Sequence, residues 1–281
     1  MQVFTTKAAV RDSVRAWRAE GQSVALVPTM GYLHRGHMAL VERAKAQADR
    51  VVTSIFVNPL QFGPGEDLAT YPRDADRDLA MLGEAGVDGV FLPSVEEVYP
   101  PGAQTIVETT ELAKMLIGKL RPGHFRGVTT VVTKLFNIVQ PDVAVFGEKD
   151  YQQLCIIRQM VRDLDVPVRI EGVATVREED GLALSSRNVR LTPEDRAASV
   201  ILSQSLFAAE EMAKTGITAS RLRAWVAANI GANPRADLQS ADIRDAETLA
   251  SISGRLQRPA VILLAVRFGK VLLIDQRVVT P

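Results

Sequence analysis

The chain has 281 residues, of which 47% are hydrophobic and 23% are charged. These fractions are typical of folded globular proteins and exclude a disordered or fibrous chain, and the length suits about two domains. Lysine plus arginine (33) equals aspartate plus glutamate (33), so the chain lacks the basic excess of nucleic-acid-binding proteins. Cys155 is the single cysteine and cannot form an internal disulfide, and the longest apolar run, 260–266, is far shorter than the roughly 20 residues of a membrane-spanning helix. We therefore expect a cytoplasmic protein that binds neither nucleic acid nor membrane.

Short apolar, β-branched runs alternate with helical patterns through the first 175 or so residues. The pattern predicts strands at 23–28, 51–57, 89–93, 143–146 and 168–173, with helices at 38–48, 74–85 and 128–139. This alternation indicates an α/β domain, in which a parallel sheet carries helices on both faces. Ligands of such sheets bind beyond the carboxyl ends of the strands, so the residues that follow each strand are the first candidates for a functional site.

The pattern changes at about residue 176. Thr192 precedes a proline and two acidic residues, which predicts the start of a long helix running towards Lys214. A second helix should begin near Ser220, and strands are expected at 238–244 and within 260–274, where a turn at 267–270 separates two of them. We therefore predict two domains, an α/β domain over residues 1–175 and a smaller α+β domain over residues 176–281.

All three histidines lie in two glycine-containing turns, His34 and His37 in residues 28–37 and His124 in residues 121–127. The first turn follows the first predicted strand of the alternating series and precedes a helix, where backbone N–H groups favour an anion such as a triphosphate. Two alternatives remain. A histidine pair spaced i, i+3 can bind a metal, although no third ligand lies nearby, or it can be structural and bond only to backbone groups. We favour the phosphate interpretation.

The H-x-G-H turn resembles the signature of the adenylyl-transferring superfamily that includes class I aminoacyl-tRNA synthetases. Together with five further segments it resembles the pantoate–β-alanine ligase family; these segments are 54–62 (SIFVNPLQF), 71–73 (YPR), 121–127 (RPGHFRG), 146–153 (FGEKDYQQ) and 180–188 (DGLALSSRN). The resemblance extends from Val24 to about Leu191 and is weaker in the C-terminal third, and it departs at minor positions, Tyr32, Arg35 and Leu184.

The resemblance implies a Rossmann-like first domain and a reaction in two steps. ATP and pantoate first give pantoyl adenylate and pyrophosphate, and β-alanine then attacks the adenylate to give pantothenate and AMP. Negative charge builds on the phosphates in the first step, so the site needs preorganised cations and hydrogen-bond donors. The catalytic residues that the resemblance implies are His34, His37, Lys149, Ser185 and Arg187, with His37 as a proton donor.

The resemblance also implies binding residues for each substrate. Those for ATP are Met30, Gly31, Tyr32, Leu33, His34, Arg35, Gly36, His37, Gly147, Glu148, Lys149, Asp150, Val176, Leu184, Ser185, Ser186 and Arg187, with Asp150 as the candidate ligand for the Mg²⁺ that accompanies ATP. Pantoate has a carboxylate, two hydroxyls and a gem-dimethyl group, so its pocket should be apolar on one side and rich in amides on the other. The amides of Gln61 and Gln153 suit the amide-rich side. The substrate-binding residues that the resemblance implies are Gln61, Gln153, Asn58, Tyr71 and Arg121. The family further implies a homodimer, with residues 176–281 as a lid and dimer domain.

Three other functions are compatible with an α/β fold that binds a nucleotide. A nucleotidyltransferase would attach a nucleotide to its acceptor and stop there, so β-alanine would leave its turnover unchanged. A nicotinamide-binding oxidoreductase would have a G-x-G-x-x-G turn after its first strand, whereas this chain has P-T-M-G-Y-L-H-R-G-H. A non-catalytic ATP-binding module would bind without turnover.

Overall fold

The computed structural model describes all residues from Met1 to Pro281. They form two compact units. The first unit comprises residues 1–147 and 156–173, and the second comprises residues 148–155 and 174–281.

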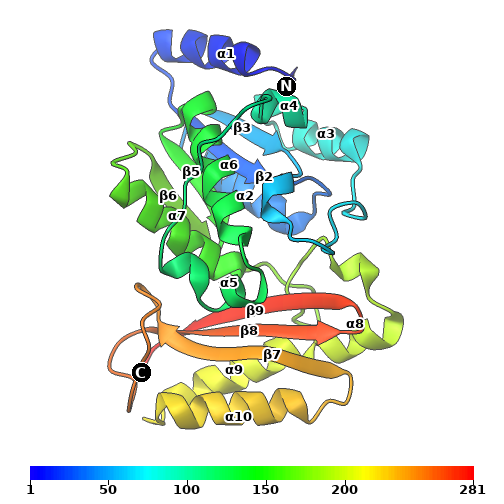
Figure 1. The fold of residues 1–281 in the computed structure, drawn as a ribbon, viewed down its shortest axis with the longest axis vertical. Helices are drawn as coiled ribbons and strands as arrows, with labels where there is room; N and C mark the ends of the chain where they lie inside the picture. Colours follow the sequence, from blue (N-terminus) through cyan, green and yellow to red (C-terminus); the bar gives the residue numbers. More distant parts are fainter. The chain divides into compact units, whose positions relative to one another are not determined.

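The first unit contains a six-stranded sheet, in the order β1-β4-β3-β2-β5-β6, coloured blue to green in Figure 1. Its strands are β1 (Gln2–Phe4), β2 (Val24–Thr29), β3 (Arg50–Ile55), β4 (Gly89–Phe91), β5 (Val143–Gly147) and β6 (Arg169–Val173). Every neighbouring pair is parallel, which confirms the prediction from the sequence. No pattern in the sequence indicated β1 or the helix that follows it.

Helices cover both faces of this sheet. They are α1 (Lys7–Ala19), α2 (Arg35–Lys45), α3 (Ala75–Glu84), α4 (Val95–Val98), α5 (Ile117–Leu120), α6 (His124–Val139) and the part of α7 (Tyr151–Asp163) that follows Cys155, with 3₁₀ turns η1 (Pro59–Gln61) and η2 (Leu112–Lys114). Ala25 and Val27 of β2 pack in one core with Leu40 of α2 and Leu82 of α3. Side chains alternate along a strand, so the fully buried Leu26 points to the opposite face, where α6 contacts β2.

The order of the strands reverses at β2. From β2 the chain proceeds outward through β3 and β4, whereas β5 and β6 lie on the other side of β2. Ligands of open α/β sheets bind at the carboxyl ends of the strands where such a reversal occurs. The segments that leave the sheet at this edge are residues 30–34 after β2 and the 3₁₀ turn η3 (Glu148–Asp150) after β5.

The second unit contains an antiparallel sheet with helices, as the sequence predicted. The sheet comprises β7 (Ala236–Asp245), β8 (Ala260–Phe268) and β9 (Val271–Val279), in that order, and the helices are α8 (Pro193–Ser199), α9 (Ile201–Ala213) and α10 (Ala219–Gly231), with a 3₁₀ turn η4 (Asn188–Arg190). Leu206 of α9, Leu222 of α10 and Ile262 of β8 are fully buried in one core. In Figure 1 the yellow helices α9 and α10 lie along the orange and red strands. None of the helices in the chain combines the length and the hydropathy needed to span a membrane.

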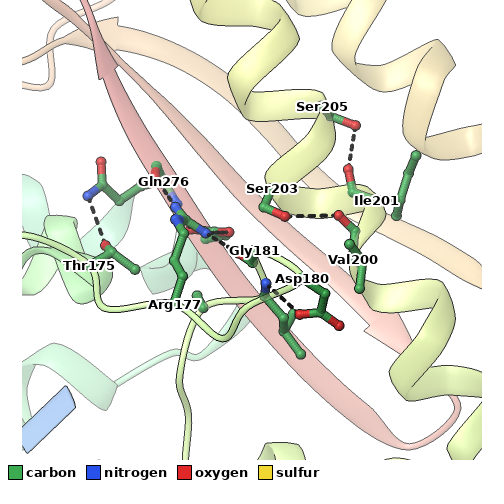
Figure 2. A network of polar contacts seen from close by, with 12 residues as sticks. Thr175, Arg177, Asp180, Gly181, Val200, Ile201, Ser203, Ser205 and Gln276 are labelled. Atoms are coloured by element: carbon green, nitrogen blue, oxygen red, sulfur yellow. Dashed lines mark hydrogen bonds and ion pairs between the residues drawn. The ribbon is translucent and has the colours of Figure 1, made fainter. Parts of the chain in front are cut away.

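The prediction of one long helix after Thr192 was wrong, because the structure has two helices that meet at Val200. Thr192 caps α8 as expected, and its Oγ1 accepts a hydrogen bond from the backbone N–H of Asp195 (3.2 Å). The hydroxyl of Ser199 donates to the carbonyl of Arg196 (2.7 Å) and that of Ser203 to the carbonyl of Val200 (3.0 Å; Figure 2). Serine hydroxyls that bond to carbonyls of the preceding turn bend helices, which accounts for the interruption.

Candidate active site

The two histidines of the H-x-G-H turn form the first turn of α2. His34 is the N-terminal cap, and its Nδ1 accepts a hydrogen bond from the backbone N–H of Gly36 (3.1 Å). The backbone N–H of His34 in turn donates to Nδ1 of His37 (3.2 Å), and the two rings lie 4.1 Å apart between centroids. Since both Nδ1 atoms accept, each neutral ring carries its proton on Nε2. The pair can therefore donate two hydrogen bonds to an anion.

The backbone before His34 adopts an unusual conformation. Gly31 has a φ of +82° and Tyr32 a φ of +52°, so two consecutive residues are left-handed, a conformation that L side chains disfavour. A side chain on Gly31 would also have little room, because an added Cβ would lie 3.0 Å from both Oδ2 of Asp78 and Cγ2 of Ile55. Glycine is therefore required where the chain turns from β2 towards the histidines.

Asp78, at the first turn of α3, holds this backbone, and no pattern in the sequence singled it out. Its carboxylate is 1% exposed and accepts hydrogen bonds from the backbone N–H groups of Tyr32 and Leu33, both at 2.7 Å. Burial raises the pKa of Asp78, although these two backbone hydrogen bonds act in the opposite direction. An aspartate in the first turn of a helix usually faces solvent, so its sequence position alone could not have revealed this contact.

Three of the predicted binding residues meet beyond the ends of β2 and β3. Asn58 caps η1, and its Nδ2 donates to Oε1 of Gln61 (3.0 Å). Nε2 of Gln61 donates to the sulfur of Met30 (3.1 Å). Gln61 and Asn58 are buried, so the structure provides a fixed amide beside a thioether.

Arg121, another predicted binding residue, lies beside the same turn. Its guanidinium forms a forked ion pair with Glu66 (2.8 and 2.5 Å) and donates to the carbonyl oxygen of Gln61 (3.3 Å). That carbonyl also accepts from Nδ1 of His124 (2.8 Å), so the third histidine carries its proton on Nδ1. The hydrogen bond from Arg121 is the main cause that lowers the pKa of Glu66, a residue that no pattern in the sequence indicated. Tyr71 is buried, with its ring edge-on to Phe62.

The second unit holds the predicted residues that follow β5. Lys149 lies in η3 with its Nζ 3.7 Å from the carboxylate of Asp150, whose side chain is about half exposed (49%). The hydroxyl of Tyr151 donates to the carbonyl of Ala246 (2.8 Å), which ties the start of α7 to the segment after β7. Gln153 lies in the same first turn of α7.

A small hairpin over residues 176–184 carries Val176 and Leu184, two further predicted ATP-binding residues. The backbone N–H of Leu184 donates to the carbonyl of Val176 (3.0 Å), and Arg177 pairs with Ala183 across the hairpin. Arg177 extends towards β9, where it forms an ion pair with the fully buried carboxylate of Asp275 (2.7 Å) and also donates to the carbonyl of Gly181 (3.1 Å; Figure 2). This ion pair fixes the hairpin on the sheet of the second unit.

Ser185, Ser186 and Arg187 directly follow this hairpin. The hydroxyl of Ser185 accepts a hydrogen bond from the backbone N–H of Arg187 (3.2 Å), and Nδ2 of Asn188 donates to the carbonyl of Ala183 (3.0 Å). The segment is therefore a tight turn anchored at both ends, of a kind that can present hydroxyl and guanidinium donors to phosphate oxygens.

No group of three or more histidine, cysteine, aspartate and glutamate side chains is arranged to hold a metal ion. Mg²⁺ that accompanies a nucleotide needs only one or two carboxylates, because the phosphates supply the remaining ligands. The half-exposed carboxylate of Asp150 fits that requirement as a single donor.

Comparison with known proteins identifies the family. Residues 2–278 match the model of the pantoate-beta-alanine ligase family. The chain is 55% identical to the pantothenate synthetase of Bartonella henselae over 277 residues, which cover 98% of both chains. It is 53% identical to the enzyme of the same name from Agrobacterium fabrum over 280 residues, which cover 99% of this chain and 96% of the relative.

Solved structures agree with this assignment. The crystal structure of pantothenate synthetase from Thermus thermophilus superposes over 100% of both chains with a TM-score of 0.95 and 49% identity. A pantoate-beta-alanine ligase from Francisella tularensis, crystallised with a β,γ-ATP compound and β-alanine, gives a TM-score of 0.81 and 35% identity over 99% of this chain and 97% of that one. The chain therefore belongs to the pantoate–β-alanine ligase family.

Proposed function

We propose that the chain joins pantoate to β-alanine with cleavage of ATP to AMP and pyrophosphate, through a pantoyl-adenylate intermediate. The match of residues 2–278 to the ligase family carries this proposal. The Francisella relative was crystallised with a β,γ-ATP compound and β-alanine, which supports the same nucleotide and amine substrates here.

In the first step a carboxylate oxygen of pantoate attacks the α-phosphorus of ATP, and the bond to pyrophosphate breaks. Charge increases on the α-phosphate and on the leaving group, so donors fixed before the reaction lower the barrier. We assign this role to the Nε2–H groups of His34 and His37 in the first unit, and to Lys149, Ser185 and Arg187 in the second. No protein nucleophile is required. Mg²⁺ bound by Asp150 and the phosphates would neutralise part of the triphosphate charge.

We assign pantoate to the turn around Gln61. The amide of Gln61 can both donate to and accept from the hydroxyls of pantoate, while Met30 offers an apolar surface to the gem-dimethyl group. Asn58 fixes the orientation of the Gln61 amide through the hydrogen bond between the two side chains. Tyr71, Arg121 and Gln153 complete the proposed substrate-binding set.

In the second step the amine of β-alanine attacks the acyl carbon, the bond to the AMP oxygen breaks, and the nitrogen loses a proton to solvent. Charge returns to the α-phosphate as AMP leaves, so the same donors act again. We assign His37 as the proton donor and Gln61 as a contact for β-alanine, in line with the resemblance to the family.

The adenine is assigned to the segment around Val176 and Leu184, and the triphosphate to residues 30–37 and 147–150 with Ser186 of the loop. We further propose that the enzyme is a cytoplasmic homodimer, that residues 1–175 bind ATP and pantoate, and that residues 176–281 serve as a lid and dimer domain. The family resemblance supports these assignments.

The direct test measures pyrophosphate and AMP released by the purified protein from Mg-ATP and pantoate, with and without β-alanine. Pyrophosphate should require pantoate, and AMP should be released in repeated turnovers only with β-alanine. Turnover that β-alanine does not change, with a different acceptor in place of pantoate, would contradict the proposal and favour a nucleotidyltransferase.

Two substitutions test the assigned donors. His34→Ala and Lys149→Ala should each lower the rate of adenylate formation by at least about a hundredfold without unfolding the protein, as the loss of a single transition-state donor does. Lys214→Ala is the matched control, because that lysine is exposed at the end of α9 and pairs only with Glu211 of the same helix. Pyrophosphate release close to that of Lys214→Ala from either folded variant would remove that residue from the site.

A further inference from the structure

We propose that Asp78 is a positioning residue, which fixes the backbone before His34 and thereby the orientation of the His34 and His37 rings. The inference rests on the proposed function, because it concerns how the donors for the phosphates are held. Asp78 itself contacts only the backbone of the turn in this assignment, and it is assigned no contact with a substrate.

Asp78 contacts a segment that is distant from it in the sequence. Its two carboxylate oxygens accept the N–H groups of Tyr32 and Leu33, one oxygen each, at 2.7 Å. The adjacent residue of α3, Arg77, lies over the ring of Tyr32 with its guanidinium carbon 5.5 Å from the ring centroid. The first turn of α3 therefore holds both the backbone and the side chain of Tyr32.

The held backbone is strained. Tyr32 has a φ of +52°, directly after Gly31 at +82°, and a residue with a side chain keeps a left-handed conformation only where its surroundings impose it. Successive N–H groups that converge on one anion form the kind of concavity known from phosphate-binding loops, and here the anion is the internal carboxylate of Asp78.

The strained segment leads directly into the histidines. Leu33 immediately precedes His34, whose own N–H bonds to the ring of His37 and whose ring caps Gly36. A rotation of the backbone at Leu33 moves the N–H of His34, so the His37 ring loses its partner, and it also displaces the His34 ring from the N–H of Gly36. Burial raises the pKa of Asp78, which means that its ionised form is costly for the fold at neutral pH. The two hydrogen bonds that the buried carboxylate accepts fix the geometry of the turn.

Histidine NMR can test this directly, because the chain has only three histidines. In the wild type, His34 and His37 should carry their protons on Nε2, whereas His124 should carry its proton on Nδ1 and serve as an internal reference. Nitrogen-15 shifts separate the two tautomers. The assay reports the positions of the rings without any substrate.

The test variant is Asp78→Asn, since an amide has one acceptor oxygen for two N–H groups and places its own N–H₂ against the other. The signals of His34 and His37 should shift or become mixed between tautomers while His124 stays unchanged. Pyrophosphate release with saturating pantoate should fall about 10- to 100-fold, the usual effect of misplacing a catalytic group by about 1 Å. The KM for β-alanine should change less than about twofold, because no amine contact is removed.

Asp88→Asn is the matched control. Asp88 is a carboxylate of the same unit that accepts the backbone N–H of Val51 (2.8 Å) and pairs with Arg50 (2.7 Å), but it lies at the amino end of β4, at the opposite edge of the sheet. This variant should leave all three histidine signals in place. If Asp78→Asn does not fold, Asp78→Glu keeps both acceptor oxygens but displaces them, and the same signals are read.

Unchanged His34 and His37 signals in a folded Asp78 variant would overturn the proposal. So would equal changes in all three histidines, which would indicate a general loss of structure. A wild-type protein that shows the expected tautomers but no turnover with pantoate and β-alanine would instead refute the proposed function, so the two failures are distinguishable.

Discussion

Replacing Gly127 with alanine should damage the proposed pantoate site through the backbone alone. Gly127 lies in the first turn of α6, where the helix touches the turn that carries Gln61. A Cβ added at Gly127 would lie 2.3 Å from the carbonyl oxygen of Leu60 and 2.5 Å from the backbone nitrogen of Gln61. Cβ atoms are essentially never found within 3.0 Å of such neighbours, so α6 and η1 must separate by at least 0.7 Å, the difference between 3.0 and 2.3 Å.

The expected change in the stability of Gly127→Ala follows from two opposing effects. A glycine-to-alanine change within a helix favours folding by about 1 kcal/mol. Forcing an extra methyl group into a packed contact costs about 1–3 kcal/mol, and the upper part of that range applies because backbone atoms cannot rotate away as a side chain can. The net loss should be about 1–2 kcal/mol in the free energy of unfolding. A shift of about 1 Å at Gln61 should also lower kcat/KM for pantoate by up to about a hundredfold.

Gly83→Ala provides the control, because Gly83 lies in α3 and the nearest atom to an added Cβ is 3.9 Å away, at the end of Met1. The free energy of unfolding of Gly83→Ala should rise by up to about 1 kcal/mol, from helix propensity alone. Denaturant unfolding of the two variants gives the stability difference, and pyrophosphate release against pantoate concentration gives kcat/KM. Equal stability of the two variants would refute the packing argument. A destabilised Gly127→Ala enzyme with wild-type kcat/KM for pantoate would refute the role assigned to Gln61.

Two further predictions concern the ion pairs around the site. Arg121 lowers the pKa of Glu66, so this pair should stabilise the fold above the carboxyl's ordinary pKa of 4.5, and that contribution should disappear as the pH falls through the lower pKa of the folded state. Glu66→Gln should therefore be about 1–2 kcal/mol less stable than wild type at neutral pH after allowance for solvent screening, and a gap in urea unfolding that is as large at pH 3 as at neutral pH would contradict this. Asp275→Asn leaves Arg177 without its buried partner, so it should destabilise the second unit by about 3 kcal/mol and speed hydrogen exchange at the N–H of Leu184. Wild-type exchange at Leu184 would show that the ion pair does not hold the hairpin.

The central strands could be predicted because they are buried on both faces and so appear as continuous apolar runs. Residues 24–27 of β2 are all fully buried, and the alternation of such runs with helices determines a parallel sheet. β1 lacks this signal, since it has three residues and Val3 is 47% exposed. Its pairing with β4, from Gln2 opposite Gly89 to Phe4 opposite Phe91, makes it a strand, and a pairing between residues so far apart leaves no local pattern.

The reactive groups of the candidate site could be proposed from the sequence for a related reason. Met30, Asn58 and Gln61 follow neighbouring parallel strands whose last residues, Thr29 and Ile55, are directly opposite each other. Parallel strands bring the segments after them to one edge, so residue types suited to the chemistry are found by looking just beyond each strand.

The groups that hold these residues in place could not be found in this way. Asp78 and Glu66 are acidic residues in a helical first turn and a loop, where most carboxylates are solvated. Their partners lie 45 residues away for Asp78 and Leu33, and 55 residues away for Glu66 and Arg121. A reacting group is restricted by its chemistry to a few residue types at one point in the fold, whereas a supporting carboxylate can come from any segment that reaches the right N–H or guanidinium group. A sequence motif therefore indicates candidate donors for a ligand, and only the folded chain reveals what fixes their geometry.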